Sequence, residues 1–460
     1  MRVIMAARRG RYNRPPVVPT APQAPRGLDS AVTLRGSLRP PPSKSLVLRT
    51  VVCGTLCDEP LTIEGVWGGG DVDAALALLS ALGVEHARSG EDLLVRGARR
   101  DGRPTWPMAR AVDVGESGTL ARMATALLAL CGDPRRPATV GGRGSLARRR
   151  SPALLRALER AGARIDRTRG DGWPLTVHSA PGEADLALEA PESSQEASAL
   201  LLALAGRERT GILEVHGELP SRPYLEMTCA VLASLGVSIE RVRSGSRERF
   251  PLAGPPRPPV GPVTIEADAS AAAVALAAGC LSGGGVRTEG VGARSLQGDA
   301  AVVGHLAAFG CAAGAGDDHL WAEGRPSRGA VCDLAGEPDL APVLAAVAAG
   351  AAAAGHSSRL EGLGTLDGKE SPRLEWLVGA LRLLGFEVGA GETWLEVAGA
   401  RSEAKLAAGE LDPAGDHRMA FAGALLGLVV PGTRVRDPSC VHKSWPGFWG
   451  DLARLADLDR

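Results

Sequence analysis

Amphipathic helices of one type recur along the whole chain. Each predicted helix carries Leu and Ala at spacings of three and four residues, ends in a glycine and is followed by a short strand, as in LLRALERAGARI and LVGALRLLGFEV. Glycine directly after a periodic segment is typical of a helix C-terminus. The terminal glycines are Gly83, Gly162, Gly236, Gly310 and Gly385, at intervals of 79, 74, 74 and 75 residues. The segment FWGDLARLADL near the C-terminus fits a sixth copy.

A second element recurs with the same period and consists of a short polar cluster followed by a run that is apolar nearly all round. Examples are SGTLARMATALLALCG and DHRMAFAGALLG. A helix that is apolar on every side is buried, and Ser or Asp at its start is a favourable N-cap residue. The copies start near Ser45, Ser117, Ser194, Ser270, Asp339 and Asp416, at intervals of 72, 77, 76, 69 and 77 residues.

Two independent elements that share one period predict six copies of one α/β unit, each with a surface helix, a buried helix and strands. A chain of 460 residues is too long for a single ordinary core, and its 45% hydrophobic content is sufficient for two. We therefore expect two similar domains with three units each.

The polar clusters predict a binding site for anions. The N-terminus of a buried helix presents unpaired N–H groups and a partial positive charge, and six such ends directed at one place would attract phosphate and carboxylate groups. Only four lysines occur among the 52 basic residues, and three of them lie within or next to these clusters: Lys44, Lys369 and Lys443. A single cluster would be explained by helix capping alone, whereas six together favour a polyanionic substrate.

Composition excludes several other classes of function. The 52 basic and 52 acidic residues balance, which argues against a protein that binds nucleic acid or anionic membranes. The apolar stretch 340–355 is too short and too weak to span a bilayer. The eight cysteines show neither a CxxC pair nor a metal-binding Cys/His spacing, so we expect buried, reduced thiols and no metal site. Residues 1–28 lack the apolar core of a signal peptide; we expect a disordered extension on a cytoplasmic protein.

The clusters also resemble the motifs of a known family. Pro42-Ser43-Lys44-Ser45 through Arg49, the segment Ser117-Gly118-Thr119 through Arg122, and Ser193-Ser194-Gln195 follow one another in the order of the 5-enolpyruvylshikimate-3-phosphate synthase (EPSP synthase) family. Ser221-Arg222-Pro223-Tyr224, Asp268-Ala269-Ser270, Gln297-Gly298-Asp299, Pro338-Asp339, Lys369 through Arg373, Asp416-His417-Arg418 and Asp437 through Lys443 continue the series. Each motif is weak alone, but ten in order over about residues 30–455 are highly specific.

The resemblance implies the fold of the enolpyruvyl transferases, an inside-out α/β barrel. In that fold each of two domains holds three βαβαββ-type units around buried parallel helices, and two strands cross between the domains. It further implies one domain made of residues 29–43 and 266–460, a second domain of residues 44–265, and a site between them that closes on substrate.

The implied reaction transfers the enolpyruvyl group of phosphoenolpyruvate to the 5-hydroxyl of shikimate 3-phosphate, with no metal or organic cofactor. Residues that resemble the family's shikimate 3-phosphate ligands are Lys44, Ser45, Arg49, Ser193, Ser194, Ser221, Tyr224, Asp339, Thr365 and Lys369. Those that resemble its phosphoenolpyruvate ligands are Lys44, Gly118, Arg149, Gln195, Arg373, Arg418 and Lys443. The partners are thus two small anions, and we expect a monomer.

The implied chemistry needs a base for the sugar hydroxyl and an acid for the enol methylene. Asp339 fits the base, Glu370 fits the proton donor that later takes a proton back, and Lys44 would stabilise charge. From the sequence alone Asp339 could equally be an N-cap, and Glu370 could form a solvated surface pair with Lys369. We expect His417 to have a supporting role and Gln297-Gly298-Asp299 to be a structural turn.

Several positions depart from the family pattern. Thr365 and Asp367 stand where the family usually has Asn and Arg, and Glu116 stands where it has Asn. Arg148, Arg149 and Arg150 are consecutive, so the choice of Arg149 as ligand depends on the register. These departures leave room for a non-catalytic protein that binds phosphorylated ligands. A transferase acting on UDP-N-acetylglucosamine is the other alternative, although the reactive Cys of that family is missing from Gly142–Ala147.

Overall fold

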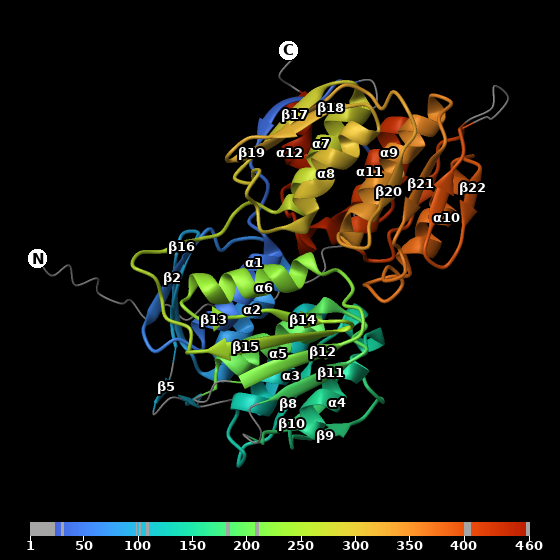
Figure 1. Cartoon of the computed structure of the whole chain (residues 1–460). Helices are drawn as coiled ribbons and strands as arrows, with labels where there is room; N and C mark the ends of the chain where they lie inside the picture. Colours follow the sequence, from blue (N-terminus) through green and yellow to red (C-terminus); the bar gives the residue numbers. More distant parts are fainter. Residues whose placement is uncertain are drawn as a thin grey trace, which may run out of the picture.

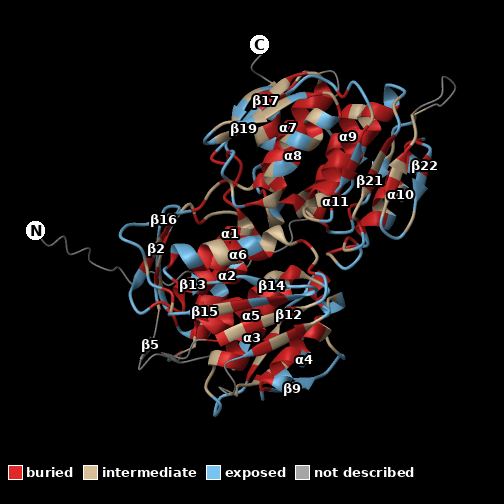
Figure 2. Ribbon diagram, viewed as in Figure 1, coloured by how far each residue is buried: buried red, intermediate tan, exposed pale blue. Residues whose placement is uncertain are grey.

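The computed structural model describes residues 24–28, 32–97, 99–100, 103–106, 110–180, 185–207, 211–399 and 406–456. These residues form two α/β bodies, which we call the lower and the upper domain as they appear in Figure 1. Six buried helices form their interiors: α1 (Lys44–Gly54), α3 (Gly118–Cys131) and α5 (Ser194–Ala205) below, and α7 (Ala269–Ser282), α9 (Ala341–Ala353) and α11 (His417–Val429) above. Figure 2 shows these helices buried, as their uniformly apolar sequences predict.

Five of the six buried helices begin at a side-chain cap. The caps are Ser43, Ser117, Ser193, Asp268 and Asp416, each of which accepts a hydrogen bond from a backbone N–H of the first turn. Three of them precede the predicted starts at Ser45, Ser194 and Ser270 by one or two residues.

Asp339 is not a cap, so one of its two predicted roles is wrong. It lies in the short 3₁₀ turn η3 (Pro338–Leu340), and α9, which starts at Ala341, has no side-chain cap within the described chain. The carboxylate of Asp339 is therefore available for another role.

Six further α-helices of the described chain lie outside the buried ones. They are α2 (Gly70–Leu82), α4 (Pro152–Arg160), α6 (Pro223–Ser234), α8 (Val302–Ala308), α10 (Arg373–Leu383) and α12 (Phe448–Ala456). The five glycines predicted to end the first five of these helices all have φ between 72° and 97°, a left-handed backbone conformation in which glycine is favoured. The first repeated element of the sequence is thus confirmed.

Five units share one sheet topology, in which a parallel pair of strands is continued by antiparallel strands. The first sheet of the lower domain has the strand order β16 (Val263–Thr264), β2 (Pro60–Glu64), β4 (Asp92–Arg96) and β3 (Glu85–Ser89). The second has the order β7 (Ala111–Asp113), β8 (Ala138–Gly141), β10 (Leu175–His178) and β9 (Arg164–Arg167). The third has the order β11 (Leu186–Glu189), β12 (Gly211–His216), β15 (Arg247–Ala253) and β13 (Ser238–Ile239), with β14 (Val242–Ser244) paired to β15.

In the upper domain the sheets are β1 (Arg35–Leu38), β17 (Gly285–Glu289), β19 (His319–Glu323) and β18 (Ala312–Ala315), and β20 (Val331–Asp333), β21 (Ser358–Glu361), β23 (Leu395–Val397) and β22 (Val388–Ala390). In the sixth unit the described residues form only the parallel pair β24 (Glu410–Leu411) and β25 (Arg434–Val435). A small hairpin, β5 (Arg99–Arg100) and β6 (Arg103–Pro104), completes the strands. The expected fold class of repeated α/β units is confirmed.

The chain passes between the domains twice, and the two passages touch. Pro42 bridges Ala267, and the N–H of Ser43 donates to the carbonyl of Glu266 at 2.9 Å. The lower core draws on residues from Leu46 to Ile265, and the upper core on Leu34 and residues 267–455. The domain limits of 29–43, 44–265 and 266–460 remain a prediction.

The predicted disordered extension falls largely on residues 1–23, which lie outside the described residues. Residues 24–28 are described, and Arg26 exchanges two backbone hydrogen bonds with Val435, of 2.9 and 2.7 Å. These residues are therefore placed against the upper domain, where we expected disorder. None of the helices in the described parts of the chain is both long and apolar enough to cross a membrane.

Candidate active site

A polar pocket lies where the two domains meet. Its lining comes from the N-terminal ends of buried helices and from neighbouring loops of both domains. It brings together Lys44, Ser45, Arg49, Gly118, Arg149, Ser193, Ser194, Gln195, Ser221, Tyr224, Asp339, Lys369, Glu370, Arg373 and Arg418. Of the predicted site residues, only Thr365 and Lys443 are outside this lining in the described structure.

Asp339 is surrounded by positive charge. Its carboxylate lies 2.8 Å from Arg418 Nη2, 3.0 Å from Arg373 Nη1 and 3.6 Å from Lys369 Nζ, and the Tyr224 hydroxyl donates to it at 3.1 Å. Burial alone would raise the pKa of this carboxyl, but Arg418, Lys369 and Arg373 hold the pKa well below its usual range. Asp339 is therefore a carboxylate at neutral pH.

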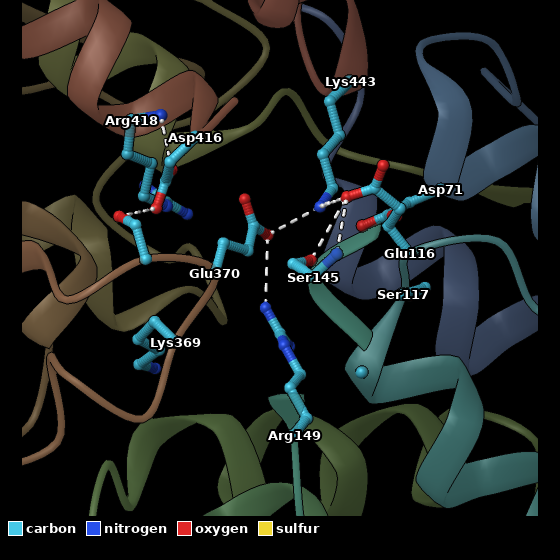
Figure 3. Close-up of polar contacts among 12 residues, drawn as sticks. Asp71, Glu116, Ser117, Ser145, Arg149, Lys369, Glu370, Asp416, Arg418 and Lys443 are labelled. Carbon is cyan, nitrogen blue, oxygen red and sulfur yellow. Dashed lines mark hydrogen bonds and ion pairs between the residues drawn. The ribbon is translucent and has the colours of Figure 1, made fainter. Parts of the chain in front are cut away.

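Glu370 is the second carboxylate of the site and is buried, with an exposed fraction of 8%. Its carboxylate lies 3.0 Å from Lys443 Nζ and 3.5 Å from Arg149 Nη2 (Figure 3). His417 Nδ1 lies 3.0 Å from the same carboxylate. The solvated surface pair with Lys369 is thus wrong. Burial would raise the pKa of Glu370, yet His417, Lys443 and Arg373 hold it well below its ordinary value. His417 has the supporting contact that we expected.

Two of the lysines differ in their surroundings. Lys44 Nζ pairs with Asp71 at 3.1 Å, and this carboxylate raises the pKa of Lys44 although burial opposes the shift. For Lys369, burial outweighs the attraction of Asp339 and lowers the pKa. Lys44 is therefore a firmly charged cation, and Lys369 is the one that gives up a proton more easily.

Arg49 is almost fully buried and lines the pocket. Its guanidinium donates to Thr228 Oγ1 at 2.7 Å and to the backbone carbonyls of Ser45 and Tyr224 at 2.8 and 3.0 Å. Burial lowers the pKa of Arg49 to about 10, which leaves it charged. A guanidinium has five N–H groups, so the three bonds leave two donors for a ligand.

Arg122 is a positioning residue that was absent from the predicted site. It donates to Ser151 Oγ at 2.8 Å, to the Gly118 carbonyl at 3.0 Å and to Gln195 Oε1 at 3.0 Å. The last bond occupies the amide oxygen of Gln195 and leaves the amide NH₂ for the pocket. Its place in the Ser117 to Arg122 cluster was the signal available in the sequence.

Arg149 is the member of the arginine triplet that lines the pocket. The side chain of Arg148 donates instead to the backbone carbonyl of Glu370 at 2.8 Å, and the carbonyl of Arg150 accepts from Arg122. The guanidinium of Arg149 packs on Gly118, where a β-carbon would overlap with Nη1.

Acidic residues in the pocket were missed by the sequence analysis. Asp299 accepts from Tyr224 at 3.3 Å and pairs with Ser270, and burial together with the nearby Asp339 raises the pKa of Asp299 to about 6. Asp299 thus faces the pocket, although we expected its motif to be a structural turn. Gln297 does hold the turn, since its side-chain amide bonds to the backbone of Ala267 and Ala269.

A sequence model of the family described as EPSP synthase (3-phosphoshikimate 1-carboxyvinyltransferase) matches residues 28–452. A 3-phosphoshikimate 1-carboxyvinyltransferase of Methanopyrus kandleri is 36% identical over 433 residues, which cover 93% of this chain and 97% of the relative. A relative of the same name from Laribacter hongkongensis is 33% identical over 445 residues, and the match covers 93% of this chain and 98% of the relative.

The chain belongs to the EPSP synthase family. The fold agrees with solved structures: EPSP synthase from Acinetobacter baumannii superposes with a TM-score of 0.73 at 21% identity, covering 95% of this chain and 97% of that one. The enolpyruvyl transferase NikO from Streptomyces tendae superposes with a TM-score of 0.69 at 19% identity, covering 93% of this chain and 96% of NikO. At this identity the likeness concerns the fold.

The departures from the EPSP synthase pattern have different structural consequences. Asp367 accepts a hydrogen bond from the N–H of Leu374 at 3.1 Å, so its charge stabilises the start of α10 and does not line the pocket. Thr365 Oγ1 is buried without a hydrogen-bond partner in the described structure. Glu116 lies beside Lys443, at the edge of the pocket (Figure 3).

Glu370, Asp416 and His417 lie close enough together to share a cation in principle. Arg373, however, already donates to both oxygens of Asp416, at 2.8 and 3.3 Å, and Lys443 lies 3.0 Å from Glu370. Side chains thus supply the positive charge that these carboxylates need.

Proposed function

We propose that the pocket carries out the family's enolpyruvyl transfer from phosphoenolpyruvate to the 5-hydroxyl of shikimate 3-phosphate. The observation that carries this proposal is the placement of two carboxylates, the partly buried Asp339 and the buried Glu370, among cations from both domains. Two reacting anions need such a cationic site to be brought together, and the reaction needs two groups that exchange protons.

The phosphoenolpyruvate subsite is formed by Arg149, Arg373, Arg418 and Lys443, with Gln195 and the backbone of Gly118. The forked guanidinium groups suit carboxylate and phosphate oxygens. Shikimate 3-phosphate is assigned to the neighbouring residues Lys44, Ser45, Arg49, Ser193, Ser194, Ser221, Tyr224, Asp339, Thr365 and Lys369. Lys443 lies just outside the lining, where it adds a positive charge to this subsite beside Glu370.

The cations around Asp339 explain how a strongly acidic carboxyl can act as a base. Without substrate, Arg373 and Arg418 stabilise its charge and hold its pKa low. An incoming phosphoenolpyruvate draws the same guanidinium groups to itself, which weakens their hold and raises the basicity of Asp339. The base is thus activated when the second substrate is in place.

The proton transfers then balance. Asp339 takes the proton of the 5-hydroxyl while the oxygen attacks C2 of phosphoenolpyruvate. Bound phosphoenolpyruvate also draws Lys443 and Arg373 away from Glu370, so the pKa of Glu370 rises; Glu370 takes up a proton from solvent and donates it to the methylene carbon. The resulting ketal phosphate loses inorganic phosphate after Glu370 removes a proton from the new methyl group, and Asp339 returns its proton to the leaving phosphate. Lys44 and Lys369 stabilise the negative charge of the transition state.

Phosphate release from the two substrates tests the proposal. Release that depends on shikimate 3-phosphate is the expected result, with UDP-N-acetylglucosamine as the parallel acceptor. Folded protein that releases phosphate with neither acceptor would instead support a binding protein. We expect the active protein to be monomeric and cytoplasmic.

A further inference from the structure

Glu116 places a carboxylate next to a cation of the phosphoenolpyruvate subsite. It follows β7 and precedes the cap of α3, and its side chain is 39% exposed. Its Oε2 accepts hydrogen bonds from the backbone N–H and the hydroxyl of Ser145, at 3.3 and 3.2 Å, and lies 3.9 Å from Lys443 Nζ (Figure 3).

The loop around Glu116 is built to hold this carboxylate. Gly144 has φ of +58°, and a β-carbon at this residue would overlap with the carboxylate of Glu116. Ser145 continues into the 3₁₀ turn η1 (Gly144–Arg148), which is followed directly by Arg149. Glu116 therefore has a defined position, set by the same turn that delivers Arg149 to the pocket.

Lys443 lies between two carboxylates that belong to different domains. Glu370 of the upper domain is 3.0 Å from its ammonium group, and Glu116 of the lower domain is 3.9 Å away. A phosphate or carboxylate that approaches Lys443 must therefore share this cation with Glu116 and is repelled by it. In a partly buried site this repulsion is screened less than at the surface.

We propose that Glu116 is a positioning residue that acts as a built-in counter-anion of Lys443 and lowers the affinity for phosphoenolpyruvate. It occupies Lys443 in the resting protein and links the two domains through this cation. Shikimate 3-phosphate, which is assigned to the other side of the pocket, is affected much less. This inference rests on the proposed function only for the assignment of the two subsites.

A purely structural role for Glu116 predicts a different result. If the carboxylate served only to hold the loop at Ser145, a side chain that still accepts this hydrogen bond would leave binding unchanged. Glu116→Gln separates the two roles, because its amide oxygen can accept from Ser145 while the negative charge is gone. Glu116→Asn, with the residue usual in the family, is a second variant in case the first folds poorly.

The experiment compares steady-state constants of the wild type and the two variants. We expect the KM for phosphoenolpyruvate to fall roughly three- to tenfold and the KM for shikimate 3-phosphate to change less than about twofold, as for the loss of one screened charge interaction. Glu189→Gln is the matched control, since Glu189 is 40% exposed and lies 3.7 Å from Arg160, outside the pocket lining. An unchanged or higher KM for phosphoenolpyruvate in both variants overturns the proposal.

A binding measurement separates this proposal from the proposed reaction. Calorimetric titration of phosphoenolpyruvate into the resting protein needs no turnover, so it reports on Glu116 even if no phosphate is released. Tighter binding by Glu116→Gln than by the wild type supports the counter-anion role. Equal binding, or no measurable binding by either protein, contradicts it.

Discussion

The guanidinium of Arg149 packs directly on the backbone of Gly118, at the first residue of a buried helix. The contact leaves no space for a methyl group, because a β-carbon at residue 118 would overlap with Nη1. It also fixes the distance between a guanidinium and the N-terminus of α3, two groups that attract the same anion.

We expect Gly118→Ala to displace Arg149 and to weaken binding of phosphoenolpyruvate. The KM for phosphoenolpyruvate should rise about tenfold, as a loss of roughly 1.4 kcal/mol of binding free energy implies, while the KM for shikimate 3-phosphate stays within about twofold. Steady-state kinetics with each substrate varied in turn would measure this. Equal increases in both KM values would show a general disturbance of the pocket instead.

Glu370→Gln should retain both substrates but lose turnover. The amide preserves the shape of the side chain and cannot donate and take back a proton, so kcat should fall roughly 10²- to 10⁴-fold. Binding of shikimate 3-phosphate, followed by calorimetry, is the control. Turnover near the wild-type rate would remove Glu370 from the mechanism.

Asp339→Asn should alter how stability depends on pH. Because the folded pKa of Asp339 lies below the ordinary value of 3.8, its charge stabilises the folded state above about pH 4, and this contribution is lost as the pH falls through the folded pKa. At pH 7 the variant, which leaves Arg373 and Arg418 without this partner, should be about 3 kcal/mol less stable.

Urea unfolding of wild type and Asp339→Asn between about pH 2 and pH 7 would measure this difference, because the contribution is lost as the pH falls from about 4 through the folded pKa. The gap between the two proteins should narrow toward the acidic end. A gap that is constant over the whole range would mean that the charge of Asp339 does not contribute to stability.

Arg122→Lys should destabilise the lower domain as well as the pocket. A single ammonium group cannot reach the acceptors that the guanidinium serves on Ser151, Gly118 and Gln195, so the free energy of unfolding should fall by about 2 to 4 kcal/mol. Arg160→Lys, at a residue with a 57% exposed side chain, is the control and should change stability by less than about 0.5 kcal/mol. A comparable effect of both changes would contradict the positioning role.

The repeat was readable from the sequence because it depends on local chemistry. Buried helices must be apolar on all sides, and the glycines at positions such as Gly83 and Gly385 mark left-handed helix ends. Lys44 and Arg418 could be predicted for the same reason, since they lie in the first turns of α1 and α11, in register with the period. Arg149, which follows a 3₁₀ turn, was found only through the family resemblance. The sixth unit also shows both helix patterns, but these patterns do not reveal that its described residues form only one strand pair.

The acidic members of the site depend on contacts between distant segments. Asp299 looks like a turn residue until α7 and η3 bring Ser270 and Asp339 to it. Similarly, the sequence around Asp367 does not show whether its side chain faces an anion or accepts a hydrogen bond from the first turn of α10. The period of a repeat defines where helices begin, but the direction of a side chain is decided by the packing of units far apart in the chain.

The pairing of β1 with β17 has a consequence for synthesis on the ribosome. Arg35 opposes Gly285 in this parallel pair, so the first strand to emerge waits for a partner about 250 residues later. At translation rates of about 5 to 20 residues per second, this delay is roughly 12 to 50 s. The lower domain, whose core needs nothing beyond residue 265, is complete before that partner appears. During this delay the growing chain therefore carries a folded lower domain and an unpaired strand β1. A chaperone that binds β1 would protect the chain until β17 is synthesised.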